Sequence, residues 1–126
     1  MKKITVAFFL ALLMGASGAW GQCSRIRFAR GSTTAVINGK VGAKKNACYD
    51  LHAREGQHMT VHLTSPDRRV RFSIGPNEYD ADFLEGAMGV TQWEGELSSA
   101  SGNGNFSIYV NAPRAGSTFT LEVTIR

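Results

Sequence analysis

The stretch that decides the fold is Cys48–Ile74, CYDLHAREGQHMTVHLTSPDRRVRFSI. Apolar residues take every second position in three successive runs: Tyr49, Leu51 and Ala53; Met59, Val61 and Leu63; and Val70, Phe72 and Ile74. A period of two is the side-chain period of a β-strand with one buried and one solvated face. The stretch therefore predicts three strands whose apolar faces need a second layer to cover them.

Two short polar segments separate these three strands. Arg54-Glu55-Gly56 lies between the first two, and its glycine can take the positive φ that closes a hairpin. A three-residue loop sets Leu51 opposite Met59 on one face, whereas a two-residue loop would set Leu51 opposite Thr60 and mismatch the faces. We therefore predict a hairpin with a three-residue loop, and a turn at Ser65-Pro66-Asp67 into the third strand.

The alternation also occurs on both sides of this stretch. Upstream, Ile26 and Phe28 alternate with arginines in segment 25–30, which predicts a first strand that ends at Gly31-Ser32. Segment 35–41 predicts a second strand with a bulge or tight turn at Asn38-Gly39. Segments 106–110 and 119–125 predict two further strands near the C-terminus. Seven or eight short strands without a helical period in this part of the chain predict an all-β fold, an antiparallel β-sandwich.

The segment between these two groups of strands alternates less regularly. Gly75-Pro76-Asn77 predicts the start of a long loop, and segment 90–97 returns to strand with a bend at Glu94-Gly95. A polar, glycine-rich turn follows at Ser98–Asn105. The acidic part of the loop, Glu78–Glu85, offers carboxylates that could bind Ca²⁺. Because it lacks the spacing of an EF-hand, we predict a plain acidic loop and keep a Ca²⁺ site as the alternative.

The N-terminus has the composition of a cleaved signal peptide. Two lysines precede an apolar run, Ile4–Met14, that is too short to span a bilayer, and cleavage after Ala19 or after Gly21 stays open. The predicted organisation is a signal peptide at 1–21 and one β-sandwich domain at 22–126. We expect a periplasmic or secreted protein whose mature form has no membrane span.

The charge of the mature chain is small but unevenly distributed. Removal of the two N-terminal lysines would lower the formal net charge from +4 to +2. Ten basic and three acidic residues lie between Gln22 and Arg71, against two and seven from Phe72 onward. Nucleic-acid binding favours basic residues interleaved with exposed aromatic rings, and the aromatic residues here mostly hold core positions. We therefore expect no nucleic-acid partner.

Cys23 and Cys48 are the two cysteines of the chain. Because exported cysteine pairs are usually oxidised, we predict a structural disulfide that ties the first strand to the central stretch. His52 and His58 would face each other in the predicted hairpin, and His62 lies about 13 Å further along the strand, too far to share an ion. We predict solvated histidines, no metal site built from them and no cofactor.

The motifs of the whole mature chain resemble one family. They are Ile26-x-Phe28-Ala29-x-Gly31, Ala35-x-Ile37-x-Gly39-x-Val41, Tyr49-x-Leu51-x-Ala53-x-x-Gly56-Gln57, Trp93-x-Gly95-x-Leu97, Gly104-x-Phe106-x-Ile108-x-Val110 and Phe119-x-Leu121-x-Val123-x-Ile125. Together they resemble the pre-peptidase C-terminal-like domain, most closely the periplasmic inhibitors of g-type lysozyme, from Arg25 to Arg126. The positions are mainly apolar residues and glycines that maintain a fold, so they are more specific for the sandwich than for the function.

The resemblance implies loops that enter the active-site cleft of a lysozyme. The family carries Ser-Gly-x-Tyr before the penultimate strand and an arginine after it. Here Arg114 matches the arginine, and Asn103-Gly104-Asn105-Phe106 takes the place of Ser-Gly-x-Tyr without its phenol. The predicted partner-binding residues are Ser101, Gly102, Asn103, Asn105, Tyr109 and Arg114.

Two functions follow as hypotheses. The first is an exported inhibitor that blocks a lysozyme, of the g-type by resemblance, by inserting loops into its cleft. The alternative is a carbohydrate- or cell-surface-binding accessory module without inhibitory activity. The chain has no Gly-x-Ser-x-Gly and no His-Glu-x-x-His motif, so we do not expect an enzyme.

Overall fold

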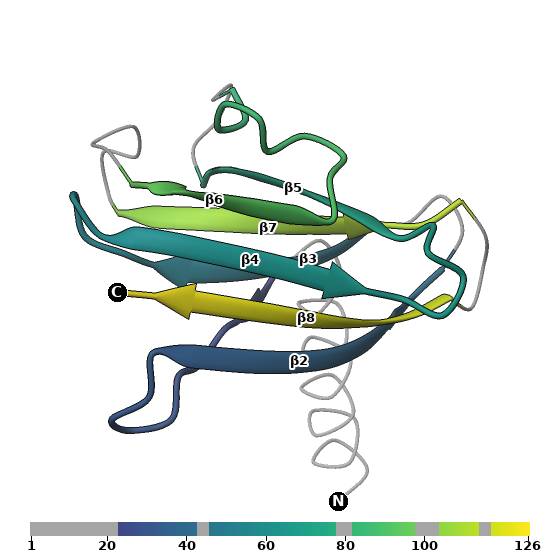
Figure 1. Cartoon of the computed structure of the whole chain (residues 1–126), viewed down its shortest axis with the longest axis horizontal. Coiled ribbons are helices and arrows are strands. Elements are labelled where there is room, and N and C mark those ends of the chain that lie inside the picture. The colour runs from purple at the N-terminus through teal and green to yellow at the C-terminus, as the bar shows by residue number, and fades with distance from the viewer. Residues whose placement is uncertain (1–22, 43–45, 78–81, 98–103, 114–116) are drawn as a thin grey trace, which may run out of the picture.

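The computed structural model describes residues 23–42, 46–77, 82–97, 104–113 and 117–126, and these form two packed β-sheets (Figure 1). The strands are β1 (Ser24–Arg25), β2 (Thr34–Val41), β3 (Asn46–His52), β4 (His58–Thr64), β5 (Arg71–Pro76), β6 (Gln92–Glu96), β7 (Asn105–Asn111) and β8 (Ser117–Ile125). One sheet has the order β1-β3-β7-β5 and the other β2-β8-β4-β6. Apart from the parallel pair β1 and β3, the paired strands run antiparallel. The predicted β-sandwich is confirmed.

The described residues contain no helix that is long and apolar enough to cross a membrane. The predicted signal peptide, at 1–21, lies outside the described part of the chain.

The central stretch does not form the predicted hairpin and three-stranded meander. β3 pairs with β7, β4 pairs with β6 and β8 in the opposite sheet, and β5 returns to the first sheet beside β7. The connection 53–57 is therefore a crossing between the sheets, with Gly56 at φ 89°. Alternation identifies the buried face of a strand but not its hydrogen-bonded neighbour, which explains the wrong pairing.

The apolar rows of the central stretch nevertheless lie in the core, as predicted. Because β3 and β4 belong to opposite sheets, Leu51 and Met59 cover the core from two sides, and each is fully buried. The largest fully buried side chains come from both sheets: Phe72, Phe106, Leu51, Met59, Ile74, Leu97, Ile108, Leu121, Val61, Val70, Val110 and Val123. Burial of one such side chain contributes about 1.5–3 kcal/mol.

Gly39 lies within a continuous β2 strand, so the predicted bulge or tight turn is wrong. It pairs with Phe119 of β8, and a Cβ atom at this position would lie 2.6 Å from Phe119 Cζ and 2.9 Å from Tyr49 Oη. The Tyr49 and Phe119 rings meet edge to face at 6.3 Å, and burial raises the pKa of the Tyr49 hydroxyl. The glycine is needed because two aromatic rings occupy the space of its missing side chain.

We expect Gly39→Ala to lower the free energy of unfolding by about 1 kcal/mol or more. Overpacking of a filled site typically costs about 1–3 kcal/mol, which exceeds the gain of about 0.4–1 kcal/mol from a stiffer unfolded chain. Urea denaturation of the parent, Gly39→Ala, Phe119→Leu and the double variant measures the coupling. The smaller leucine side chain of Phe119→Leu should reduce the cost of Gly39→Ala, and an equal cost in both backgrounds would contradict this packing argument.

The free edge of β5 is covered by segment 82–90. Phe72 and Val90 exchange backbone hydrogen bonds of 2.8 and 2.9 Å, and Ile74 N–H donates to the Ala87 carbonyl at 2.9 Å. Gly75 and Pro76, predicted to open a loop, belong to β5, and Gly95, predicted as a bend, belongs to β6. The extra pairing protects an edge that would otherwise be open to other chains.

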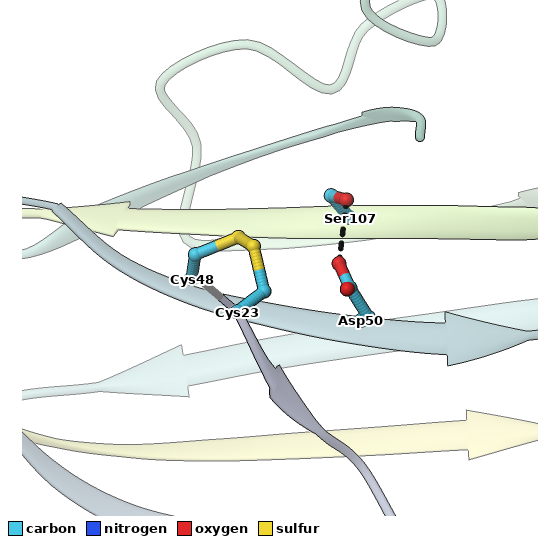
Figure 2. Close-up of a disulfide and its surroundings, with 4 residues drawn as sticks. All are labelled: Cys23, Cys48, Asp50 and Ser107. Atoms are coloured by element: carbon cyan, nitrogen blue, oxygen red, sulfur yellow. Dashed lines mark hydrogen bonds between the residues drawn. A yellow bond between two sulfur atoms is a disulfide. The ribbon is translucent and has the colours of Figure 1, made fainter. Parts of the chain in front are cut away.

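The first strand is shorter than predicted and lies earlier in the chain, because β1 ends at Arg25 and leaves out the predicted positions Ile26 and Phe28; a disulfide fixes it. Only Ser24 and Arg25 pair with β3, and the Ile26 N–H then donates to the Asp50 carbonyl at 2.8 Å. The predicted Cys23–Cys48 disulfide is confirmed, with the two Cα atoms 4.5 Å apart (Figure 2). Beside it along β3, the Ser107 hydroxyl of β7 donates to Asp50 Oδ1 at 2.7 Å.

Candidate functional site

The structure describes two of the six predicted partner-binding residues. Ser101, Gly102, Asn103 and Arg114 lie outside the described residues. Asn105 is the first residue of β7 and Tyr109 lies within that strand. The predicted residues belong to two predicted loops, Ser101–Asn105 and Asn111–Gly116. The stems of these loops, at Asn105 and Asn111, lie at opposite ends of β7, about 20 Å apart at 3.3 Å per residue.

The stems of segment 98–103 are fixed to the crossing between β3 and β4. On one side, Leu97 exchanges backbone hydrogen bonds with the crossing, donating to Gln57 O and accepting from Gly56 N–H, both at 2.7 Å. On the other side, Ala53 N–H donates to Gly104 O at 2.9 Å, and Gly104 has φ 75°. Segment 98–103 therefore begins and ends on a rigid part of the sandwich, which suits residues that must meet a partner in one geometry.

Asn105 is held in place by two neighbours. Its side-chain Oδ1 lies 3.1 Å from His52 Nδ1, and its backbone carbonyl accepts from Asn77 N–H at 2.9 Å. Because an amide oxygen only accepts hydrogen bonds, the His52 Nδ1 carries the proton in this pair. His52 therefore belongs to the same end of the sandwich as the predicted loop, a connection that the sequence pattern did not indicate.

A pocket of about 340 Å³ lies beside this pair. It is lined by Phe28, Ser32, Thr33, His52, Ala53, Arg54, Gln57 and Ile125. Arg54 is exposed, and its guanidinium has no hydrogen-bond or ion-pair partner among the described residues. This combination of an imidazole, a guanidinium and hydroxyl groups over an apolar floor can accept a polar side chain of another protein.

Tyr109 lies on the outer face of the β7 sheet rather than in a loop. Its ring packs edge to face on Phe83 with centroids 6.2 Å apart, and the tyrosine is half-buried. Phe83, which comes from the segment covering β5, is 41% exposed. Tyr109 therefore supports the fold of this segment, and its predicted partner contact would be through the exposed part of the ring.

The histidines do not form the arrangement predicted from the hairpin. His52 lies in β3 and His58 in β4, which belong to opposite sheets, so the two side chains do not face each other. His58 Nε2 is 2.8 Å from Glu94 Oε2 in an exposed pair, and His62 is exposed. When the imidazole is protonated, an exposed pair of this kind contributes at most about 1 kcal/mol.

The one group of described side chains close enough to share a metal ion is Cys23, Cys48 and Asp50. Both sulfur atoms are joined in the disulfide, so they are not thiolate ligands. In the acidic segment, Asp82 and Glu85 are exposed, whereas Glu78 and Asp80 lie outside the described residues. The alternative of a Ca²⁺ site there stays a prediction.

Solved structures of two lysozyme inhibitors are similar to this chain. The chain is similar to Aeromonas hydrophila PliG, a periplasmic lysozyme inhibitor of g-type lysozyme, with a TM-score of 0.64 and 25% identity over 83% of this chain and 96% of that chain. Salmonella Typhimurium PliG, also a g-type lysozyme inhibitor, gives a TM-score of 0.59 and 18% identity over 84% of this chain and 99% of that chain. The resemblance predicted from the sequence motifs is confirmed.

A more distant similarity has the same architecture. The pre-peptidase C-terminal domain of collagenase from Bacillus anthracis gives a TM-score of 0.52 and 11% identity over 83% of this chain and 95% of that chain. At this identity the similarity shows the fold alone. No protein-family model and no curated protein matches the chain.

Proposed function

We propose that this protein is an exported, periplasmic inhibitor of a g-type lysozyme. The observation that carries the proposal is the similarity to Aeromonas hydrophila PliG over 96% of that inhibitor's chain. The Cys23–Cys48 disulfide suits an oxidising compartment outside the cytoplasm. The partner is then another protein, and inhibition means covering or filling its substrate cleft.

Two ends of the sandwich offer polar groups for this contact. At one end lie Asn105 and the pocket beside His52, and the predicted residues Ser101, Gly102 and Asn103 precede Asn105 in the sequence. At the other end, Arg114 follows the stem that β7 provides at Asn111. Glycoside hydrolases commonly use carboxyl groups in their cleft, and a guanidinium can bind a carboxylate through two parallel hydrogen bonds. We therefore assign direct contact with the cleft to Arg114 and a supporting role to the Asn105 end.

Assays of the purified mature protein with goose-type, chicken-type and invertebrate-type lysozymes test this function. We expect inhibition of the goose-type enzyme at a 1:1 ratio, because blocking of a cleft requires a stoichiometric complex. Inhibition of only the chicken-type or only the invertebrate-type lysozyme would replace the proposed g-type specificity with that type. Full activity of every lysozyme in the presence of the protein, together with retention of the protein on peptidoglycan, would instead support the accessory-module hypothesis.

A further inference from the structure

Arg68 has an unusual backbone conformation for its residue type. Among the described residues it is the only non-glycine with positive φ, at 59°. This region costs an L-residue about 1–2 kcal/mol, and such strain is concentrated at functional sites. The Arg68 N–H donates to the Ser65 carbonyl at 3.1 Å, and Arg71 Nη1 donates to the Arg68 carbonyl at 2.9 Å. Both contacts hold the strained residue in place.

Arg68 and Arg71 line a pocket at the edge of the sandwich. The pocket has a volume of about 360 Å³ and is lined by Leu63, Thr64, Ser65, Arg68, Arg71 and Thr91. It lies where the chain leaves β4 for β5 and where Thr91 leads into β6, so its walls come from both sheets. Two arginines and two threonines thus line the pocket together with Leu63 and Ser65.

The acidic residue on this turn, Asp67, is not ion-paired with either arginine of the pocket. Asp67 accepts from the Arg69 N–H at 3.1 Å and from the Ser117 hydroxyl at 3.3 Å. The hydrogen bond from the Arg69 N–H is the main reason why the pKa of the Asp67 carboxyl is lowered. Neither Arg68 nor Arg71 has an ion-pair partner among the described residues.

Several hydrogen-bond donors remain for a ligand. Arg71 uses Nη1 for the carbonyls of Arg68 and Val70, at 2.9 and 3.1 Å, which leaves its Nε and Nη2 donors without a described partner. Nε and Nη2 form an edge of the guanidinium that suits two oxygens of one anion. Ser65 Oγ is buried near Asp67, so it is not among the groups that are open to a ligand.

We propose that this pocket binds a phosphate-type oxyanion carried by a small molecule or headgroup. A carboxylate has two oxygens, whereas a phosphate has enough oxygens to use two guanidinium groups and hydroxyl groups at once. The pocket is about ten times the volume of one water molecule, so it has room for the group that carries the phosphate. The site does not depend on lysozyme inhibition.

Isothermal titration calorimetry at low ionic strength tests the site with inorganic phosphate, glucose 6-phosphate and acetate. We expect saturable 1:1 binding of the phosphate compounds with a Kd of roughly millimolar or tighter, and much weaker binding of acetate. Arg68→Gly should reduce phosphate binding by about tenfold or more, because it removes one guanidinium. The same variant should melt at or above the temperature of the parent, because glycine relieves the positive φ.

Arg69→Ala is the matched control. It removes the same charge from the neighbouring position, but Arg69 does not line the pocket, so phosphate binding should change less than about twofold. Tighter binding of glucose 6-phosphate than of inorganic phosphate indicates a phosphorylated sugar. A lipid headgroup is indicated if the parent protein sediments with phosphatidylglycerol vesicles but not with phosphatidylcholine vesicles, and if Arg68→Gly no longer sediments with either. Absence of saturable phosphate binding, equal binding of acetate, or equal losses in Arg68→Gly and Arg69→Ala would overturn the proposal.

Discussion

Replacement of both Cys23 and Cys48 by serine is expected to lower the midpoint of thermal unfolding by roughly 10 °C or more. The disulfide closes a sequence separation of 25 residues, and its removal should cost about 3 kcal/mol on chain-entropy arguments. For a domain of this size, each kcal/mol corresponds to about 4–8 °C. β1 has only two residues, both exposed, so besides the disulfide this segment is held by its short pairing with β3, the Ile26 hydrogen bond to Asp50 and the buried Ile26 side chain.

Calorimetric melting with and without a reducing agent measures this effect. The reduced parent should melt like the double serine variant, and Ser24→Ala should melt like the oxidised parent, because Ser24 is exposed. Peptide mapping without reduction should recover Cys23 and Cys48 in one cross-linked fragment. Recovery of two free thiols from the exported protein, or a melting temperature that reduction leaves unchanged, would contradict the prediction.

The buried faces of the strands could be predicted from the sequence because alternation is a local property. Leu51, Met59, Phe72 and Ile108 all occupy apolar positions in alternating runs, and all are fully buried. Strand pairing depends instead on contacts between distant segments, which a local pattern does not contain. Segment 54–56 is equally compatible with a hairpin loop and with a crossing between sheets, and the structure has the crossing.

Glycines are the other source of wrong predictions. The sequence predicts Gly39, Gly75 and Gly95 at a bulge, a loop and a bend, but all three lie within strands. At each of them a Cβ atom would lie within 3.1 Å of an aromatic ring. A glycine that makes room for a ring has the same sequence signal as one that permits a turn, so only the tertiary structure separates the two roles.

The candidate site could be predicted only in part. The resemblance indicates Asn105 and Arg114, but the hydrogen bond between Asn105 and His52 joins β7 and β3, which are far apart in the sequence. This contact also decides which histidines can serve as controls for mutagenesis. A substitution of His52 would disturb the Asn105 end, whereas His58 and His62 lie in β4 of the other sheet.

We expect Arg114→Ala to weaken inhibition of the goose-type lysozyme by about 30-fold or more, which corresponds to about 2 kcal/mol, the loss typical of an interface hot spot. This follows from the proposal that the guanidinium binds a carboxylate in the lysozyme cleft. Arg114→Lys should recover only part of the loss, because an ammonium keeps the charge but not the paired hydrogen bonds. Inhibition constants from lysis of bacterial cell walls, compared with binding measured by calorimetry, give the effect.

Two controls and one comparison make the Arg114 result specific. Arg27→Ala removes the same charge at another exposed position, and the double variant His58→Ala with His62→Ala changes the outer face of the opposite sheet, so neither should weaken inhibition.

Asn105→Ala tests the other end of β7 and should have a smaller effect than Arg114→Ala, because Asn105 makes neutral hydrogen bonds. A larger loss in Asn105→Ala would assign the cleft contact to the Asn105 end. Equal losses in Arg114→Ala and Arg27→Ala would mean that general charge, rather than a specific contact, drives association. Full inhibition by Arg114→Ala and Asn105→Ala alike would remove both predicted loops from the contact with lysozyme.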